Sequence, residues 1–222
     1  MYYTCSACNL IIHGELVPLI HFGFWNVPGI TGTCVRIQWN ETPERLEPNT
    51  GPVGNCRRNT QLTDITEIPC SDAKLYLAPI LDCYDGSILG FKMDTHMKAE
   101  LCVEAYENAC VATGARGMIL HSDRGSQFTS QLFRKSLANH GAVQSMSGVG
   151  RCYDNARMES FFATLKKEKL YQMDTTKLTS EEVKSIVFRY IYYYNLRRIY
   201  STNGGWPPLV YRQYYYNKHK AA

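Results

Sequence analysis

The stretch ILHSDRGSQFTS, residues 119–130, decides how the chain is interpreted. It begins as a short apolar run, typical of a buried strand, and ends abruptly in His-Ser-Asp and a glycine turn. Strand ends in open α/β sheets are rigid and reach the surface together, and active sites usually lie there. An aspartate before glycine is also an ordinary turn former, so Asp123 alone indicates little. Whether Asp123 belongs to an active site depends on whether other acids lie close to it in the fold.

Length and composition indicate one good-sized domain, or one domain with an appendage. The chain has 222 residues, of which 45% are hydrophobic, enough to fill a core. No apolar run approaches the roughly 18 residues of a membrane span, and the N-terminus lacks a basic leader, so neither a membrane segment nor a signal peptide is expected. The 9 cysteines form no disulfide-like framework, which favours reduced thiols in a cytoplasmic protein.

The net charge of +4 is unevenly distributed along the chain. From Arg151 onward there are 13 Lys and Arg residues against 6 Asp and Glu, whereas the first 150 residues have 11 against 14. A basic C-terminal third behind an acidic front indicates a polyanionic partner. A solvated basic face explains the same composition, so charge alone leaves both interpretations open.

Periodicity after residue 60 predicts alternating strands and helices. The expected strands lie at 61–68, 74–83, 87–93, 117–123 and 142–147. The expected helices lie at 98–114, 131–140, 154–170 and from Thr179 onward. The second and third strands form a hairpin around the turn YDGS. The order predicts an α/β fold, a mixed five-stranded sheet flanked by helices, with a poorly patterned N-terminal extension and a C-terminal amphipathic helix.

Local residues indicate where several of these helices begin or end. Gly114 suits the position after a helix C-terminus, and Ser130 and Asp154 suit N-cap positions. Thr179 and Glu182 have the spacing of a capping box, in which each side chain bonds to the backbone N–H of the other.

Three acids occupy positions from which they could converge. Asp64 lies in the middle of the first predicted strand, where a charged residue is unusual unless it faces an edge or a site. If the first and fourth strands are neighbours, Asp64 and Asp123 reach the same end of the sheet. On the third helix, Asn155, Glu159 and Lys166 lie within about 40° of one another, on a polar stripe. The sequence thus predicts a pocket of three carboxylates.

Three convergent carboxylates repel one another, so leaving all of them ionised requires compensation. Hard divalent cations provide it, and Mg²⁺ prefers oxygen ligands and water. Two such ions about 3.5–4 Å apart can stabilise both the attacking and the leaving oxygen of an in-line phosphoryl transfer. The basic residues beside Glu159 would then hold a phosphate backbone: Arg157, Lys166, Lys167 and Lys169.

The segments LTDIT, HSDRGSQFTS and CYDNARMESFFATLKKE resemble the three acidic motifs of transposases from bacterial insertion sequences, of the type translated from a second reading frame. The catalytic core of these proteins is similar to that of retroviral integrases. Thirty-five residues lie between Asp123 and Glu159, and Lys166 follows Glu159 by seven positions, as in the family.

The segment YYYNLRRIYSTNGGWPP also resembles the trailing YNxxR motif of the family, which is matched by Tyr194, Asn195 and Arg198. The resemblance covers roughly residues 59–212. The three acidic motifs together are highly specific, whereas a single DxT triplet would carry no weight.

The resemblance implies an RNase H-like fold and DNA transposition: metal-dependent strand cleavage at insertion-sequence ends, followed by attack of a 3′-hydroxyl on target DNA. Asp64, Asp123 and Glu159 would be catalytic metal ligands for two Mg²⁺ ions, with Mn²⁺ as a substitute. The residues expected to contact DNA are Asn155, Arg157, Lys166, Lys167, Lys169 and Arg198, with His121 and Asn195 in supporting roles. Expected partners are DNA ends and target DNA, further copies of the chain on DNA, and the upstream-frame product of the same element. The expected location is the bacterial cytoplasm, at the nucleoid when DNA is bound.

The chain also departs from the family pattern. Gln61 stands where relatives usually have Trp, and Gly148 and Val149 stand where relatives often have basic residues. The unpatterned front end differs from the helical region that precedes the core in relatives, and we interpret it as a foreign or frame-shifted leader on a truncated element.

The chain is expected to divide into three parts. These are an unassigned extension and linker at residues 1–58, an integrase-type core with a helical C-terminal segment at 59–212, and a basic tail at 213–222.

Two other functions stay open at this point: a catalytically silent DNA-binding remnant of a transposase, and an RNase H-like nuclease on RNA–DNA hybrids or junctions.

Some residues also have simpler interpretations. Asp82 is the best rival acid, yet it stands at the entrance to a hairpin turn, where Asp is common. Cys5 and Cys8 form a CxxC pair without the second pair typical of zinc sites. The tyrosine-rich tail suits base stacking, but packing of an aromatic helix explains it as well.

Overall fold

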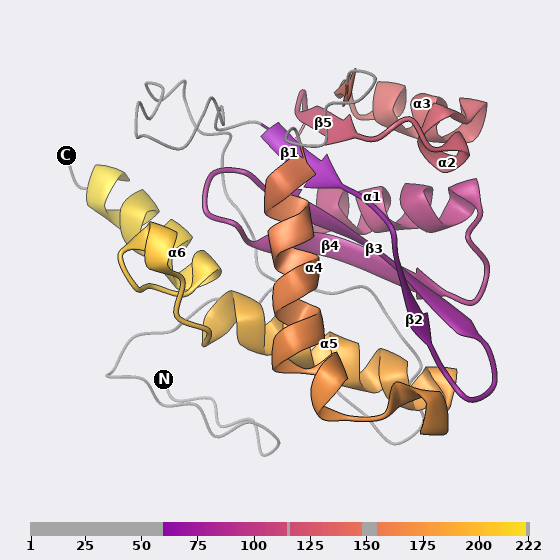
Figure 1. Cartoon of the computed structure of the whole chain (residues 1–222). Coiled ribbons are helices and arrows are strands. Elements are labelled where there is room, and N and C mark those ends of the chain that lie inside the picture. The colour runs from indigo at the N-terminus through magenta and orange to yellow at the C-terminus, as the bar shows by residue number, and fades with distance from the viewer. Residues whose placement is uncertain (1–59, 115, 148–154, 221–222) are drawn as a thin grey trace, which may run out of the picture.

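The computed structural model describes residues 60–114, 116–147 and 155–220 (Figure 1). Several predictions fall outside these ranges, namely those for the N-terminal extension and its cysteine pair and for the loop before the third helix: Cys5, Cys8, Gly148, Val149 and Asp154. Within the described ranges, no helix combines the length and the apolar character needed to cross a bilayer.

Strands and helices alternate along the described chain. The strands are β1 (Thr60–Thr63), β2 (Thr66–Pro69), β3 (Lys74–Asp82), β4 (Ile88–Asp94), β5 (Ile119–Ser122) and β6 (Val143–Met146). The α-helices are α1 (Ala99–Thr113), α2 (Ser126–Thr129), α3 (Gln131–Asn139), α4 (Ala156–Glu168), α5 (Ser180–Leu196) and α6 (Pro208–Lys220). Short 3₁₀ helices are η2 (Leu170–Gln172), η3 (Thr175–Lys177) and η4 (Ser201–Asn203).

The strands form one sheet of mixed direction. β1 lies between β3, to which it is antiparallel, and β5, to which it is parallel, and β5 continues the parallel pairing to β6. β3 and β4 form the predicted antiparallel hairpin, and β2 extends the line of β1 along β3. The α/β class and the antiparallel hairpin joined to parallel strands are therefore confirmed. The neighbouring positions of β1 and β5 meet the condition on which convergence of the first two acids depended.

The first predicted strand is interrupted at its charged residue. β1 ends at Thr63 and β2 begins at Thr66, although both pair with β3 in one continuous register. Between them, Oδ1 of Asp64 accepts a hydrogen bond of 2.8 Å from the Ile65 N–H, so a carboxylate satisfies this backbone donor. The segment 61–68 is thus two short strands on one line, and the sheet of the described chain has six strands by this division.

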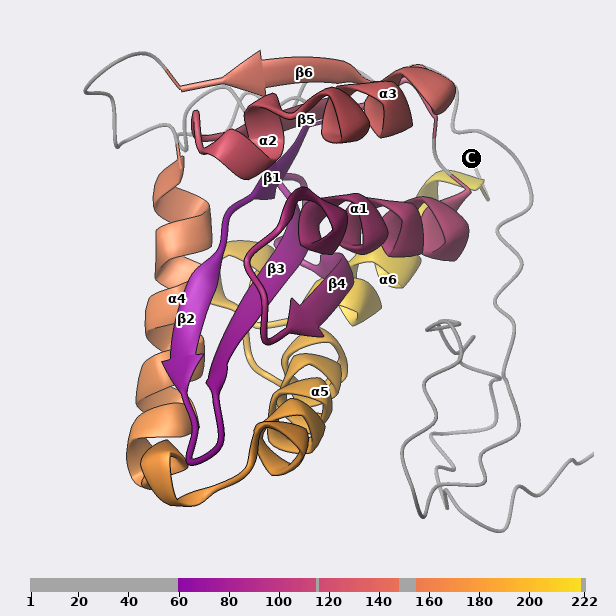
Figure 2. The same ribbon diagram turned by 90° about the vertical axis from the view of Figure 1, so that its right-hand side faces the viewer.

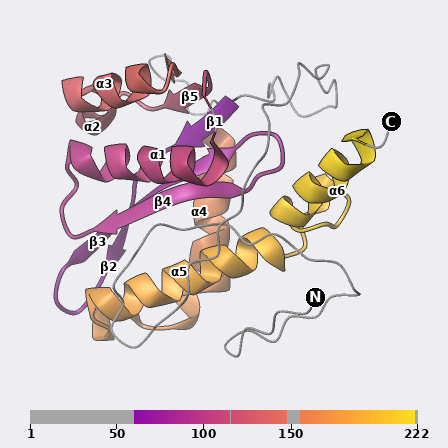
Figure 3. The ribbon, with the colours of Figure 1, turned by 180° about the vertical axis from the view of Figure 1, so that it is seen from behind.

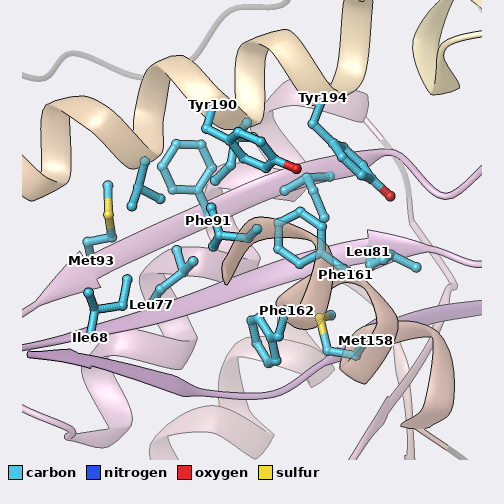
Figure 4. Close-up of a cluster of buried hydrophobic side chains, with 14 of the residues drawn as sticks. Ile68, Leu77, Leu81, Phe91, Met93, Met158, Phe161, Phe162, Tyr190 and Tyr194 are labelled. Carbon is cyan, nitrogen blue, oxygen red and sulfur yellow. The ribbon is translucent and has the colours of Figure 1, made fainter. Parts of the chain in front are cut away.

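Helices cover both faces of the sheet (Figures 1 and 2). The side chains of β3 alternate, so that Leu77 and Leu81 face α4 and α5, whereas Ala78 and Ile80 face α1. The face under α4 and α5 is rich in aromatic rings (Figure 4), which are Phe91, Phe161, Phe162, Tyr190 and Tyr194. Full burial of a side chain of this size contributes about 1.5–3 kcal/mol, so this packing holds α4 firmly on the sheet.

Three predicted helix ends are confirmed. The Ser130 hydroxyl accepts a hydrogen bond of 3.2 Å from the Phe133 N–H at the start of α3. Thr179 and Glu182 form the complete capping box at the start of α5. Gly114 ends α1 with φ at 63°, a left-handed conformation that glycine adopts without strain.

The C-terminal helix α6 lies beside α5 and next to the closed end of the β3–β4 hairpin (Figure 3). The predicted boundary between core and tail, after residue 212, falls inside this helix. Two of its tyrosines pack against the hairpin: the rings of Tyr211 and Tyr215 lie 6.1 and 5.7 Å from that of Tyr84. Packing of an aromatic helix is therefore the interpretation that holds for these two rings, while Tyr214 is 54% exposed.

Candidate active site

Asp64 leaves the sheet directly after β1 and is half-buried. Burial raises the pKa of its carboxyl to about 6, the hydrogen bond from Ile65 opposes this shift, and the negative charges of Asp123 and Glu159 add to it. Two acids distant in sequence thus contribute to the electrostatic environment of a third. The structure brings the three predicted acids to the same region of the molecule.

Asp123 follows the last residue of β5 and is exposed. Leu62 of β1 lies opposite His121 of β5 in the parallel register, so Asp64 and Asp123, each two residues further on, leave the sheet at the same end. The Asp123 carboxylate accepts a hydrogen bond of 2.9 Å from the Gly125 N–H, which orients it at the start of the glycine turn.

Glu159 lies in the first turn of α4 and is exposed. Its neighbours Met158, Phe161 and Phe162 are buried against the sheet, so the helix is held there by its apolar stripe while its polar side stays open. The N-terminal end of α4 lies near the ends of β1 and β5 (Figures 1 and 2). The helix dipole favours a carboxylate in this first turn.

The arrangement is a loose one. In the described residues, no three His, Cys, Asp or Glu side chains approach closely enough to enclose a metal ion as they stand. Asp123 and Glu159 are nevertheless exposed, and all three acids offer the oxygen ligands that Mg²⁺ prefers. The donor chemistry fits a hard divalent cation. Burial, and to a smaller extent the charges of Asp123 and Glu159, raise the pKa of Asp64, and such a cation would relieve this cost of ionisation.

His121, predicted to support the site, connects two strands. Its Nδ1 lies 2.9 Å from the Ser145 hydroxyl and its Nε2 lies 3.0 Å from the Ser147 hydroxyl, so both ring nitrogens have partners on or beside β6. These bonds fix the imidazole next to Leu62 on the face from which Asp123 emerges. The structure thus gives His121 a part in holding β6 to β5.

Four of the predicted DNA or supporting residues have internal partners or little exposed surface. Arg157 is half-buried and donates to the Cys83 carbonyl. Arg198 donates to both oxygens of Glu168, at 2.6 and 2.9 Å, and these hydrogen bonds lower the pKa of that glutamate. A DNA contact by either arginine would have to compete with these bonds.

The two asparagines are more completely enclosed. Asn195 is 1% exposed, and its amide bonds to both the N–H and the carbonyl of Ile88, at 2.9 and 2.8 Å. Asn155 is 7% exposed, and its Oδ1 has no hydrogen-bond partner among the described residues. Neither asparagine presents enough surface for DNA to contact in this conformation. The sequence showed the polar stripe of Asn155 and the motif position of Asn195, but not what packs over either side chain.

The lysines of α4 remain open to solvent. Lys167 is exposed, and Lys166 and Lys169 are half-buried. Lys166 lines an open pocket between α4 and β2 together with Tyr171, whose side chain is 73% exposed. Sequence reasoning did not single out Tyr171, which lies in η2; a tyrosine just after a run of lysines was the available signal.

Asp82, the rival acid, belongs to a different part of the molecule. It is 7% exposed and forms an ion pair of 2.6 Å with Arg212 of α6. Asp85, three residues later, pairs with the same guanidinium. Sequence reasoning missed Arg212, although two acids in a turn between apolar strands signalled the need for a cation.

Replacing Asp64 by Asn is expected to stabilise the metal-free protein at pH 8. The raised pKa, about 6, means that the folded protein holds this proton more tightly than the unfolded chain, in which aspartates titrate near pH 4. The ionised carboxylate therefore costs free energy above pH 6, and the cost disappears as the pH falls to about 4. After allowance for solvent screening we expect a gain of about 1 kcal/mol at pH 8 and little change near pH 4.

Urea unfolding in EDTA measures this gain. Asp72→Asn is the matched control, since Asp72 accepts hydrogen bonds from the Ser180 N–H and hydroxyl, which lower its pKa, and its replacement should cost stability at pH 8. Equal losses of unfolding free energy in both variants at pH 8 would contradict the inference that the ionised Asp64 carboxylate destabilises the folded protein.

Comparison with known proteins agrees with the motifs and the fold. Models of the integrase core domain match residues 57–152 and residues 159–217. The chain is 39% identical over 142 residues to the transposase for insertion sequence element IS904 of Lactococcus lactis, covering 63% of this chain and 55% of that protein. It is 36% identical over 147 residues to the transposase InsF for IS3A of Escherichia coli, covering 65% of this chain and 50% of that protein.

A third relative is matched over more of its length. An uncharacterised transposase-like protein of Haemophilus influenzae is 36% identical over 150 residues, which cover 68% of either chain. Of the IS904 and IS3A transposases, by contrast, the chain spans about half the length.

Solved structures share the fold at low sequence identity. The catalytic core domain of the HTLV-2 integrase, determined with magnesium, superposes with a TM-score of 0.52 at 16% identity, over 68% of this chain and 93% of that one. A chain of the simian T-cell lymphotropic virus intasome superposes with a TM-score of 0.56 at 15% identity, over 72% of this chain and 56% of that one. The chain belongs to the bacterial insertion-sequence transposases whose core has the RNase H-like fold of the retroviral integrases.

Proposed function

We propose that the chain acts in DNA transposition by metal-dependent phosphoryl transfer. It cleaves strands at the ends of its insertion sequence and joins the resulting 3′-hydroxyls to target DNA. The observation that carries this proposal is the position of Asp64, which follows β1, the parallel neighbour of β5, and is under the electrostatic influence of both Asp123 and Glu159. Acids gathered in this way serve no evident structural purpose, because their mutual repulsion disfavours the ionised form.

Asp64, Asp123 and Glu159 are the residues that would hold the cation. When bound, divalent ions supply a counter-charge for the oxygens that exchange at phosphorus. The HTLV-2 integrase core, whose fold this chain shares, was determined with magnesium, which supports Mg²⁺ as the ion. Two Mg²⁺ ions, replaceable by Mn²⁺, would more than neutralise the three carboxylates and leave positive charge for the DNA phosphate.

The protein's own residues position the DNA. Positive charges lie C-terminal to Glu159 on α4, at Lys166 and Lys167, and at the C-cap residue Lys169. They would bind the phosphate backbone of a DNA strand whose reacting phosphate lies at the three acids. The HTLV-2 integrase core has been determined in trimeric and dimeric forms, and we propose that this chain also assembles in several copies on DNA. An upstream-frame product of the same element would be a further partner.

Cleavage of a labelled duplex that carries the terminal repeat of the encoding element tests the function. We expect nicked and joined products with Mg²⁺ or Mn²⁺ and none in EDTA or with Asp64→Asn. Binding of the duplex without cleavage would identify a catalytically silent remnant. Cleavage of RNA–DNA hybrids or four-way junctions, with element ends untouched, would identify a nuclease of the same fold.

Lys166→Ala is expected to weaken binding to DNA and to reduce its dependence on salt. If Lys166 neutralises one phosphate, its loss makes the negative slope of log K against log salt concentration shallower by about one unit. Titrations at several salt concentrations measure the slope. Lys135→Ala is the control, because Lys135 is exposed on α3, on the opposite face of the sheet. The same slope in the wild type and in Lys166→Ala would show that Lys166 makes no phosphate contact.

A further inference from the structure

The backbone of Cys83 connects the strand that leads to Asp64 with the helix that carries Glu159. Its N–H donates a hydrogen bond of 2.9 Å to the Thr60 carbonyl at the start of β1. Its carbonyl accepts a hydrogen bond from Nη1 of Arg157, two residues before Glu159. A single peptide residue thus bonds to both parts of the candidate active site.

Among the residues that the structure describes, the first turn of α4 has few other polar anchors. Its N-cap residue, Asn155, makes no capping hydrogen bond through its side chain, and helix starts that lack such a bond leave backbone donors unpaired. The apolar stripe of α4 fixes which face meets the sheet, but non-directional packing does not by itself set the height of the helix along its axis. The bond from Arg157 to Cys83 supplies a directional contact in this turn.

Cys83 is itself held in a rigid turn. The segment 82–88 closes the β3–β4 hairpin, with the Asp82 N–H bonded to the Ser87 carbonyl at 2.9 Å. The Asp82 carboxylate accepts from the Tyr84 N–H at 2.7 Å, and the Asp85 carboxylate accepts from the Ser87 N–H at 2.8 Å. Side-chain bonds of this kind stabilise a turn from within.

Side chains from the C-terminal segment, residues 194–212, hold this turn from outside. Arg212 donates to Asp82 at 2.6 Å, to the Ser87 hydroxyl at 2.9 Å and also to Asp85. Asn203 donates to the Asp85 carbonyl at 2.8 Å.

The same segment also covers the glycine of the turn. The Tyr194 hydroxyl donates to the Gly86 carbonyl at 3.3 Å. A Cβ at Gly86 would lie 2.9 Å from the ring of Tyr200, and the φ of Gly86 is +78°, so both space and backbone conformation require glycine. Residues of α5 and η4 thus bond to a turn more than 100 positions earlier in the chain and help to fix its shape.

We propose that Arg157 is a positioning residue for Glu159, and that the C-terminal segment 194–212 completes the active site through it. Arg157 sets α4 against the Cys83 carbonyl, the C-terminal segment sets the turn that contains Cys83, and Cys83 also bonds to β1, so these contacts together determine where Glu159 stands relative to Asp64. This inference rests on the proposed catalytic role of Glu159. It replaces the expectation that Arg157 contacts DNA.

The substitutions Arg157→Met and Arg157→Lys test the proposal in the full chain. Methionine removes the donors, whereas lysine keeps a positive charge and one donor group. We expect Arg157→Met to lower kcat for strand cleavage about 10- to 100-fold, as small displacements of catalytic groups do, with KM and the Kd for DNA changed less than about twofold. Arg157→Lys should recover at least part of the rate. An unchanged kcat with a raised KM and a flatter salt dependence would instead identify Arg157 as a DNA contact.

Hydrogen exchange of the backbone amides separates this inference from the proposed function. Arg157→Met should accelerate exchange in the first two turns of α4, residues 156–162, and leave α1 unchanged. Asn203→Ala, which alters only the C-terminal side of the network, should accelerate exchange in the same α4 residues to a smaller extent. Unchanged exchange in these residues with either variant would overturn the proposal, whether or not the wild type cleaves DNA.

The two failures therefore look different. If the wild type cleaves DNA and Glu159→Gln does not, but Arg157→Met keeps its full kcat, the positioning role is wrong and the function stands. If the wild type does not cleave while exchange responds as expected, the coupling of the C-terminal segment to α4 stands and the proposed function fails.

Discussion

Glu159→Gln should reduce strand cleavage and joining by about 1,000-fold or more, while the affinity for DNA changes less than about threefold. Such a loss of rate corresponds to about 4 kcal/mol of transition-state stabilisation. A carboxamide has the size of the carboxylate but no charge, so it balances a divalent cation poorly. Glu159 is exposed on a helix held by its apolar side, so the fold should be unaffected.

Glu100→Gln is the matched control for this prediction. Glu100 is also an exposed glutamate in the first turn of a helix, α1, on the other face of the sheet. We expect it to cleave DNA at the wild-type rate within about twofold. The measurement is a single-turnover time course on the labelled element end with Mg²⁺. Comparable rates for Glu159→Gln and the wild type would remove Glu159 from the catalytic set.

Arg212→Met should destabilise the protein by about 3–5 kcal/mol, the usual cost of leaving a buried charge without its partner. Arg212 is the cation for Asp82 and Asp85, which are 7% and 1% exposed. Since small domains have only about 5–15 kcal/mol of total stability, this change is a large fraction of it. Arg212→Lys keeps the charge but loses the planar fork, and we expect a smaller loss of about 1–2 kcal/mol.

The pH dependence gives this prediction a direction. Burial raises the pKa of Asp82 to about 6 against the opposing charge of Arg212. The folded state therefore binds this proton more tightly than the unfolded chain, and the ionised form lowers stability as the pH rises from about 4 through 6. Without Arg212 only the hydrogen bond from the Tyr84 N–H opposes that cost, so the deficit of Arg212→Met should be larger at pH 8 than at pH 5.

Urea unfolding at the two pH values measures the deficit. Arg197→Met provides the control, because Arg197 is an exposed arginine at the end of α5, and its loss should cost less than about 0.5 kcal/mol. A deficit for Arg212→Met that is as small as this, or that grows on acidification, would contradict the description of Arg212 as the compensating charge of the turn.

Together these variants separate two properties that meet in one domain. Glu159 lies on the open side of α4, where substitution should alter chemistry without altering the fold. Arg212 instead bonds to Asp82 and Asp85 of the β3–β4 turn, so its substitution should alter the fold first. Arg157 lies between them, bonded to the turn that Arg212 holds and two residues from Glu159. An intermediate result for Arg157, with slower chemistry in a folded protein, is therefore informative about the connection.

Much of the secondary structure of this protein could be predicted from local sequence. The alternation of strands and helices after residue 60, the Thr179–Glu182 capping box and the Ser130 cap depend on contacts between residues a few positions apart, and periodicity or spacing reports such contacts directly. The positions of Asp123 at a strand end and Glu159 on a helix follow from the same local patterns, whereas Asp64, predicted within a strand, lies between β1 and β2.

Only the tertiary structure decided how the polar side chains are used. Arg157, Arg198 and Asn195 have sequence patterns that suit contact with DNA, yet their partners are internal. Arg212 bonds to Asp82 across 130 positions, and no local pattern indicates which of many acids such a residue will meet. Charge and helical face are properties of the sequence alone, but a bond depends on which surfaces the folded chain brings together, and that is settled by the packing of the whole sheet and its helices.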